Sequence, residues 1–367
     1  MLFCNIINLS ENNFSVFVAM KRLKNIVLIC LVSFIFSGCS IPIDIKGGGG
    51  QGFFLKSEDG GKTWKTKSEV IGGKRVIMDN ILSMAINPFN SSIVYVGTEN
   101  DGIFISNNGA ESWKKLENSL KKVYSICPSI REKGIIYVSG KVNQKGKIYR
   151  VSEEKNEWKE IYSEPSQGSE ITAMTIDEDV EEEVIYVGTS DGMIFKTINA
   201  GETWQNLYDA DGKISDIEVK GNKMLILIYG EDILMSKNNG RSFENIEFTD
   251  ENSSDIGNPF SMAVSFGKTD EVYIGTDRGL FFGRGIGGKL IRVNTLSVSD
   301  KYTTRSVSID PYDSNRVVYS VFQGLYSSYD KGKSWAIFDT ERGGGVSNII
   351  FDRNNSGVVY ATIRNFK

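Results

Sequence analysis

Short runs in which β-branched or aromatic side chains alternate with small or polar ones recur along the chain from about residue 50 onward. One such run, Val94–Thr98, returns almost unchanged as Ile185–Thr189 and Val272–Thr276. A second alternating run precedes each copy, as in Leu82–Ile86 and Ile171–Ile176. Period-two alternation bounded by turn residues is typical of strands and not of helices. The pattern therefore predicts an all-β protein.

The spacing of these runs predicts the architecture. Copies of the first run begin at residues 94, 136, 185, 224, 272, 318 and 359, so neighbouring copies lie 39 to 49 residues apart. This is the length of one four-stranded blade of a β-propeller. We therefore expect a seven-bladed β-propeller of four-stranded antiparallel blades.

The two ends of the repeat region each carry half a blade. The last unit supplies Ser347–Phe351 and Val358–Ile363, and the first supplies Phe53–Lys56 and Thr63–Lys65. Pairing them would remove two exposed strand edges. We therefore expect the ring to be closed by N-terminal strands joining the C-terminal blade.

A motif of eight residues, Ser/Thr-x-Asp/Asn-x-Gly-x-Ser/Thr-aromatic, begins at residues 57, 106, 197, 236 and 328, and only Ala110 replaces its Gly. The Asp or Asn side chain can accept hydrogen bonds from backbone N–H groups, and Gly allows a positive φ. The aromatic residue can bury a large apolar surface on the next strand. We interpret the motif as a structural turn, absent in clean form from Val151–Trp158 and Gly283–Lys289. Its main positions are Ser57, Asp59, Gly61, Trp64, Ser106, Asn108, Trp113, Thr197, Asn199, Gly201, Trp204, Ser236, Asn238, Gly240, Phe243, Ser328, Asp330, Gly332 and Trp335.

The five motifs resemble the Asp-box, or bacterial neuraminidase, repeats of sialidases, xyloglucan-cleaving glycosidases, sortilin-type receptors and photosystem II assembly factors. The resemblance spans nearly all of the chain after residue 50 and implies a β-propeller. Those proteins share a fold and no single activity. The resemblance therefore leaves the function open.

The first 50 residues have the layout of an exported lipoprotein. A basic start at Met20–Lys24 precedes the apolar run Ile26–Phe36 and the small residues before Cys39, as in a signal peptide. This end resembles a lipobox, which implies cleavage before Cys39 and a lipid on its sulfur; a soluble export signal is the alternative. We expect an extracytoplasmic protein anchored to a membrane of the bacterial cell envelope, at the cell surface or on the periplasmic side. The expected domains are an extension that is unstructured or untranslated (1–19), a signal peptide (20–38), a lipidated Cys with a Gly-rich tether (39–50) and the propeller (51–367).

The composition excludes several kinds of chemistry. The chain contains no His, which excludes Ser-His and Cys-His catalysis and imidazole-ligated metal sites. We expect Cys127 to be a buried inert thiol and Asp177–Glu183 to be a solvated connection, and we expect no metal or cofactor. The formal net charge of -4 disfavours nucleic acid as a partner.

Ligand binding in propellers usually uses the face formed by the turns between second and third strands and by the connections between blades. Two long connections are expected there, Glu247–Pro259 and Asn294–Thr304. Aromatic residues and Arg are enriched at recognition surfaces. The candidate residues for a protein or carbohydrate ligand are Tyr229, Arg278, Tyr302, Arg305 and Phe322.

The same face could carry the carboxylate pair that a glycosidase requires. Asp101, Asp191, Glu231 and Asp277 all fall in turns between second and third strands, and we expect them to be solvated and far apart. No sialidase Arg-Ile-Pro motif is present near the start of the domain. We therefore predict a binding or assembly scaffold without catalytic residues. A carbohydrate-active hydrolase of glycosidase or sialidase type and a relative of photosystem II assembly factors are the alternatives.

Overall fold

The computed structural model describes residues 53–67, 78, 80–116, 119–246, 256–265, 270–285, 289–294, 303–340 and 344–365. They belong to one compact unit, Gly49–Lys367. Every regular element of two or more residues in these ranges is a β-strand, so the all-β prediction is confirmed. None of the described segments forms a helix long and apolar enough to cross a membrane.

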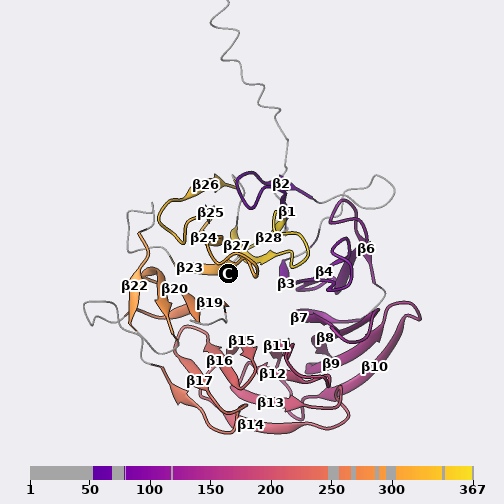
Figure 1. Cartoon of the computed structure of the whole chain (residues 1–367). Helices are drawn as coiled ribbons and strands as arrows, with labels where there is room; N and C mark the ends of the chain where they lie inside the picture. Colours follow the sequence, from indigo (N-terminus) through magenta and orange to yellow (C-terminus); the bar gives the residue numbers. More distant parts are fainter. Residues whose placement is uncertain are drawn as a thin grey trace, which may run out of the picture. The chain divides into compact units, whose positions relative to one another are not determined.

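The described strands form seven four-stranded antiparallel sheets, arranged as blades around a central axis (Figure 1). Blades 1 to 6 are β3–β6, β7–β10, β11–β14, β15–β18, β19–β22 and β23–β26, and blade 7 combines β27, β28, β1 and β2. The seven-bladed propeller is confirmed. The strands are β1 (Phe53–Ser57), β2 (Lys65–Thr66), β3 (Ile81–Ile86), β4 (Val94–Thr98), β5 (Ile103–Ser106), β6 (Lys114–Lys115), β7 (Lys121–Pro128), β8 (Ile135–Val142), β9 (Lys145–Ser152), β10 (Glu157–Ser163), β11 (Ile171–Ile176), β12 (Ile185–Thr189), β13 (Met193–Thr197), β14 (Gln205–Asp209), β15 (Ile214–Lys220), β16 (Lys223–Ile228), β17 (Ile233–Ser236), β18 (Glu244–Asn245), β19 (Pro259–Ser265), β20 (Glu271–Thr276), β21 (Gly279–Arg284), β22 (Leu290–Arg292), β23 (Thr304–Ile309), β24 (Val317–Val321), β25 (Gly324–Ser328), β26 (Ala336–Asp339), β27 (Gly345–Phe351) and β28 (Val359–Arg364).

The strand order defines two faces of the ring. Connections between blades and turns between second and third strands lie on one side, which we call the loop face. Turns between first and second strands and between third and fourth strands lie on the other side, which we call the turn face. Because each blade begins at the loop face, the first residues of every innermost strand lie near that face.

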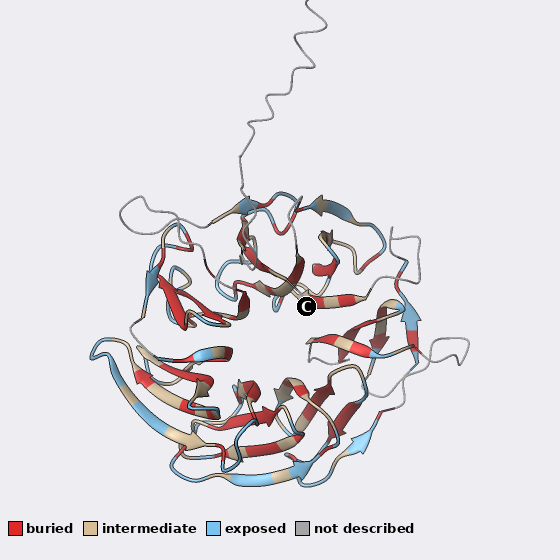
Figure 2. Ribbon diagram, turned by 180° about the vertical axis from the view of Figure 1, so that it is seen from behind, coloured by how far each residue is buried: buried red, intermediate tan, exposed pale blue. Residues whose placement is uncertain are grey.

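The hydrophobic core lies between the blades. Seven clusters of buried side chains each join two neighbouring blades. At the junction of blades 7 and 1, the ring of Trp113 lies 4.8 Å from that of Phe54, which lies 5.4 Å from that of Tyr360. Inner strands are largely buried and outer strands largely exposed (Figure 2). Each blade is therefore stabilised mainly by its neighbours, as in other repeat folds.

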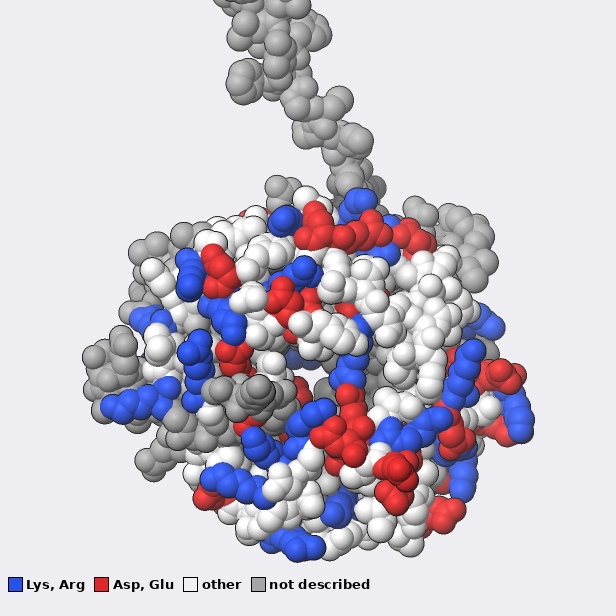
Figure 3. All heavy atoms as spheres, viewed as in Figure 1, with Lys and Arg blue, Asp and Glu red and all other residues white. Residues whose placement is uncertain are grey.

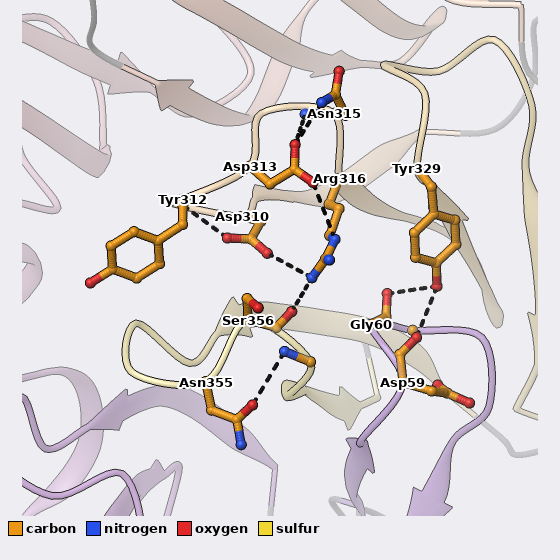
Figure 4. Close-up of polar contacts among 12 residues, drawn as sticks. Asp59, Gly60, Asp310, Tyr312, Asp313, Asn315, Arg316, Tyr329, Asn355 and Ser356 are labelled. Carbon is orange, nitrogen blue, oxygen red and sulfur yellow. Dashed lines mark hydrogen bonds and ion pairs between the residues drawn. The ribbon is translucent and has the colours of Figure 1, made fainter.

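Blade 7 closes the ring as predicted. Strand β1 pairs with β28 from Phe53 opposite Ile363 to Ser57 opposite Val359. The turn that follows β1 is also attached to blade 6, because the Tyr329 hydroxyl donates to the Gly60 carbonyl at 2.9 Å (Figure 4). The C-terminal blade is thus completed by the N-terminal strands.

The five motifs form one recurrent turn. In the first copy the Ser57 hydroxyl oxygen accepts a hydrogen bond from the Gly61 N–H at 2.7 Å, and an Asp59 carboxylate oxygen accepts one from the Thr63 N–H at 2.9 Å. The other four copies make the same two bonds. Both the fourth and the fifth residue of each copy have positive φ, whereas the sequence argument required this only of the fifth.

The acidic run Asp177–Glu183 is a connection between β11 and β12 in which Glu178, Asp179, Glu181 and Glu182 are exposed, as the sequence indicated, but it also has fixed partners. Asp177 is buried, and the Asp179 carboxylate pairs with the Lys220 ammonium at 2.7 Å. The Arg131 guanidinium donates to the backbone carbonyls of Asp177 and Glu181 at 3.1 and 3.0 Å. Arg131 of blade 2 and Lys220 of blade 4 therefore hold this largely solvated run in place.

Cys127 donates its thiol hydrogen to the Met174 carbonyl at an S···O distance of 3.0 Å. Burial and, to a smaller extent, the negative charge of Glu183 together raise the pKa of this thiol to about 12. A thiol in this state is a poor nucleophile at neutral pH. It is the free cysteine of the described residues.

Candidate functional site

A channel with a volume of about 1200 Å³ runs between the innermost strands, and all seven blades contribute to its wall. Figure 3 shows a hollow at the centre of the face drawn, among Lys, Arg, Asp and Glu side chains in which neither sign of charge dominates. In closed rings of this kind the axis is the main concave surface. We therefore built the candidate site from the residues that line the channel.

Six cationic and aromatic side chains line the channel at the loop face, and we call this set the cationic mouth. They come from five blades. Each lies near the point where an innermost strand begins or a second strand ends, which places it at the loop face. The set is Tyr124, Lys213, Tyr229, Phe260, Arg305 and Arg364.

Arg305 is in contact with two aromatic rings of the mouth. Its guanidinium donates to the Tyr229 hydroxyl at 2.6 Å, and its central carbon lies 5.5 Å from the centre of the Phe260 ring. The Tyr229 and Phe260 rings meet edge to face, with centroids 5.0 Å apart. These contacts hold the guanidinium in one orientation, because hydrogen bonding and cation–π attraction act on it together.

Lys213 lies between two tyrosines. Its ammonium nitrogen is 5.2 Å from the centre of the Tyr124 ring and 5.6 Å from that of Tyr229. Burial lowers the pKa of Lys213, and the positive charge of Arg364 lowers it further. Burial also lowers the pKa of Arg364. The mouth thus keeps positive charges partly desolvated and close to one another.

Two carboxylates lie beside the cationic mouth, and each already has partners. Glu170 pairs with the ammonium groups of Lys122 at 2.8 Å and Lys141 at 3.0 Å. Glu99 accepts a hydrogen bond from the Asn80 amide at 2.8 Å. No ion pair of Lys213 occurs among the described residues. Both acids act on the mouth, since the negative charge of Glu170 opposes the lowering of the Lys213 pKa and that of Glu99 opposes the lowering of the Arg364 pKa.

The residues proposed from the sequence are distributed unevenly. Tyr229 and Arg305 meet in the mouth, whereas Arg278 is exposed in the turn between β20 and β21. Phe322 lies in the turn between β24 and β25 with 66% of its surface exposed. Tyr302 lies outside the described residues.

Sequence reasoning missed four residues of the mouth, Tyr124, Lys213, Phe260 and Arg364. Lys213 immediately precedes an innermost strand, Phe260 is the second residue of one, and Arg364 ends a second strand. This shared position at strand ends next to the loop face is the feature of the sequence that could have identified them. A search of strand ends for Lys, Arg and aromatic residues would have found them.

The four turn carboxylates do not form a pair. Asp101, Asp191, Glu231 and Asp277 lie in blades 1, 3, 4 and 5, respectively. Asp191 accepts a hydrogen bond from the Ser169 hydroxyl at 2.8 Å, and Asp277 accepts one from the Asn258 N–H at 3.0 Å. These two acids stabilise their loops and are not simply solvated.

A different pair of carboxylates faces the channel. Asp216 and Glu218 are two residues apart on β15, so both point to the same side of the strand. Burial raises the pKa of Glu218, and the neighbouring Asp216 raises it further; burial also raises the pKa of Asp216. The described residues contain no group of three or more His, Cys, Asp or Glu side chains that could hold a metal ion.

Comparison with known proteins identifies relatives of two kinds. No family model matches the chain. Curated relatives include a xyloglucanase of Acetivibrio thermocellus, 22% identical over 156 residues, and an oligoxyloglucan-reducing end-specific xyloglucanase of Emericella nidulans, 24% identical over 125 residues. The matches cover 38% and 32% of this chain, but only 18% and 15% of those enzymes.

The solved structures that resemble this chain share its fold at low sequence identity. A GH74 xyloglucanase from Xanthomonas campestris matches with a TM-score of 0.64 and 13% identity, covering 82% of this chain and 52% of that enzyme. YCF48 from Cyanidioschyzon merolae matches with a TM-score of 0.59 and 15% identity, covering 77% of this chain and 95% of YCF48. YCF48 bound to a D1 peptide matches with a TM-score of 0.57 and 13% identity, over 77% of this chain and 93% of that one. The chain thus shares its propeller fold with xyloglucanases and with YCF48.

Proposed function

We propose that this chain is a non-catalytic binding or assembly scaffold whose protein or carbohydrate ligand binds at the loop face. One observation carries the proposal. The cationic mouth concentrates cations and aromatic rings from five blades at one end of the channel, whereas the turn carboxylates lie in four separate blades. Arg and aromatic side chains in a partly desolvated setting are the usual anchors of recognition surfaces. The net negative charge of the whole chain argues against a nucleic acid ligand.

We further propose that the protein is an Asp-box propeller attached to the cell envelope through a lipid on Cys39. The shared hydrogen-bond pattern of the five turns supports the first part. The order of basic, apolar and small residues before Cys39 supports the second.

Site-specific photo-cross-linking in cells tests the binding function. A photoreactive phenylalanine analogue is placed at Phe322, which is 66% exposed on the loop face of blade 6. The same analogue at Ile337, 54% exposed on the outermost strand of that blade, is the matched control. We expect an adduct from the Phe322 position and none from Ile337. Equal labelling at both positions would contradict a loop-face site.

A carbohydrate-active hydrolase is the second candidate. The partial matches to xyloglucanases favour it, as does the half-buried pair of Asp216 and Glu218 in the channel wall, whose carboxyl pKa values are raised. A glycosidase, however, needs its two carboxyl groups on opposite sides of the scissile bond. Two acids that point the same way from one strand do not provide that arrangement.

Reducing-end assays decide between the two candidates. The purified chain is incubated with xyloglucan and with a sialoside panel. We expect no release of reducing sugar from xyloglucan and no release of sialic acid. Hydrolysis that is lost in Asp216→Asn or Glu218→Gln, while the variant keeps its unfolding temperature, would establish the hydrolase instead. Activity lost on substitution of Asp101, Asp191, Glu231 or Asp277 would have the same consequence.

A further inference from the structure

Two exposed aromatic side chains stand at the same position of two blades. Phe89 is the third residue of the turn between the first and second strands of blade 1, and Tyr312 is the third residue of the corresponding turn in blade 6. They leave 47% and 71% of their surface exposed, and each follows a proline. Turns of this kind lie on the turn face, so both rings are on the side opposite the cationic mouth.

The backbone of each turn holds its aromatic residue in place. The buried side chains of Asn87 and Asp310 each accept a hydrogen bond from the backbone N–H of the aromatic residue, at 2.9 Å in both turns. The proline before each aromatic residue has a fixed φ. The ring of Tyr312 points away from the ion pairs of Arg316 (Figure 4). Each ring is therefore presented to solvent by a preorganised turn, which reduces the entropy that binding would cost.

The corresponding turn of blade 7 lies between these two turns in the ring and is bonded to both. The Arg316 guanidinium of blade 6 donates to the Ser356 carbonyl at 2.6 Å. The Asn354 amide of blade 7 donates to the Pro88 carbonyl of blade 1 at 3.2 Å. The three turns thus form one hydrogen-bonded unit, which we call the aromatic arc (residues 87–93, 310–316 and 352–358).

Both arginines of the aromatic arc are paired with acids of this chain. Arg316 pairs with Asp310 and with Asp313 at 3.4 Å each. Arg353 pairs with Glu178. A bound anion would have to displace one of these carboxylates, so the arc favours a ligand without charge.

Polar residues separate the two aromatic rings. The run Arg353–Ser356 of blade 7, which lies between them, is exposed throughout. The rings therefore do not join into the continuous apolar patch that a protein partner usually covers. A neutral polysaccharide fits two separate rings better, because the C–H groups on the face of each sugar can pack against the negative face of an aromatic ring.

We infer that the aromatic arc binds a neutral, extended β-linked glycan, with Tyr312 and Phe89 each packing against the face of a sugar ring. In a β-1,4-linked glucan the chain is extended and its successive sugars present flat C–H faces, so one chain can reach both aromatic residues. The inference concerns the turn face and does not depend on the loop-face binding function proposed above.

Calorimetric titration of the full-length protein with cellohexaose tests the inference. We expect the affinity to fall about fivefold or more in Tyr312→Ala and in Phe89→Ala, and to be kept in Tyr312→Phe because the ring remains. The affinity should not change between 50 and 500 mM salt, since no charged group binds the sugar. Tyr208→Ala is the matched control, because Tyr208 is an exposed aromatic residue on the outermost strand of blade 3.

Four outcomes would overturn the inference. These are an absence of cellohexaose binding, undiminished binding in Tyr312→Ala and Phe89→Ala, an equal loss in Tyr208→Ala, and tighter binding of hexaproline, a neutral extended peptide that packs on aromatic residues. Loss of affinity in Phe322→Ala with none in Tyr312→Ala would place the glycan at the loop face instead. An adduct at Phe322 in the cross-linking experiment would show that the loop-face function survives a failure at the aromatic arc.

Discussion

Arg353 of blade 7 forms an ion pair with Glu178 of blade 3, although these blades are not neighbours in the ring. Both side chains line the channel and both belong to turns between first and second strands. The pair therefore bridges the channel at the turn face, opposite the cationic mouth. A ligand held at the mouth would have its direct entry from the loop face.

A double-mutant cycle of Arg353→Gln and Glu178→Gln measures this bridge. The two side chains remain substantially exposed, at 56% and 39%, so solvent screens their attraction. We expect a coupling free energy of at most ~1 kcal/mol in chemical unfolding, with unchanged ligand affinity at the mouth. Coupling above ~2 kcal/mol would mean that the bridge is a structural requirement of the ring.

The recurrent turns should make stability depend on acidic pH. Burial opposes ionisation of Asp59, but hydrogen bonds from Thr63 and Ser57 outweigh it and lower its pKa to about 2. Hydrogen bonds from Ser334 lower the pKa of Asp330 to about 2 as well. A folded-state pKa below the unfolded value gives stability that is present above about pH 4 and is lost as the pH falls toward 2.

Asp59→Asn combined with Asp330→Asn separates charge from geometry. Three of the five turns already use Asn, as in Asn108, whose side-chain oxygen accepts the same N–H hydrogen bond at 2.9 Å. We expect the double variant to lose part of the fall in unfolding temperature between pH 4 and 2. Asp59→Ala should instead cost ~1–2 kcal/mol at neutral pH, because the Thr63 N–H and the hydroxyls of Ser57 and Thr63 lose their acceptor. A double variant with the wild-type pH profile would contradict this account.

Ala110 and Gly61 occupy the same position in two turns, but exchanging Ala and Gly should affect stability much more at Gly61 than at Ala110. Ala110 is buried with a φ of 71°, so its neighbours accommodate a methyl group. A Cβ at Gly61, where φ is 101°, would lie 2.4 Å from the Ser327 hydroxyl oxygen. We expect Gly61→Ala to cost more than ~2 kcal/mol and Ala110→Gly to change stability by less than ~1 kcal/mol. If the two substitutions cost the same free energy in urea unfolding, the backbone φ and not the contact of the added Cβ with Ser327 would determine the effect.

The blades could be predicted from the sequence because their information is local. Each blade repeats the same alternation, and alternation alone assigns one face of a strand to the core. Closure of the ring by Phe53–Ser57 and Val359–Arg364 could be predicted because each end of the repeat region carries half a blade. These features need only the order of residue types along the chain.

The cationic mouth could not be predicted in the same way because ring closure creates it. Arg364 lowers the pKa of Lys213 although 151 positions separate the two residues in the sequence. Which strand-end residues point into the channel depends on register irregularities such as the shift between Ile214 and Asp216. Of the six residues of the cationic mouth, the sequence indicates only Tyr229 and Arg305, because these are aromatic or cationic residues close to expected loops.

Lipid attachment at Cys39 is a prediction about residues outside the described ranges. The basic, apolar and small-residue order ending at Cys39 implies processing by lipoprotein signal peptidase. We expect Cys39→Ser to abolish incorporation of radiolabelled palmitate and globomycin to cause accumulation of the uncleaved precursor. Cys30→Ser is the control, because Cys30 lies within the segment expected to be removed. Undiminished label in the Cys39 variant would refute the anchor.

Trp64→Ala tests whether the N-terminal half-blade holds the ring closed. Trp64 is 7% exposed and packs in the cluster that joins blades 6 and 7, and its indole N–H donates to the Gly61 carbonyl at 3.0 Å. Removing a buried Trp side chain typically costs ~3–5 kcal/mol. Because Trp64 is the large side chain that packs the N-terminal half-blade against blade 6, its loss should loosen β1 and β2, and amide hydrogen exchange in Phe53–Ser57 should accelerate more than elsewhere. Trp158→Ala is the matched control: Trp158 packs on Tyr149 within blade 2, with ring centroids 5.9 Å apart, and its loss should leave the exchange of β1 unchanged. Uniform acceleration of exchange in both variants would mean that the ring unfolds as a whole and that the closing blade has no special role.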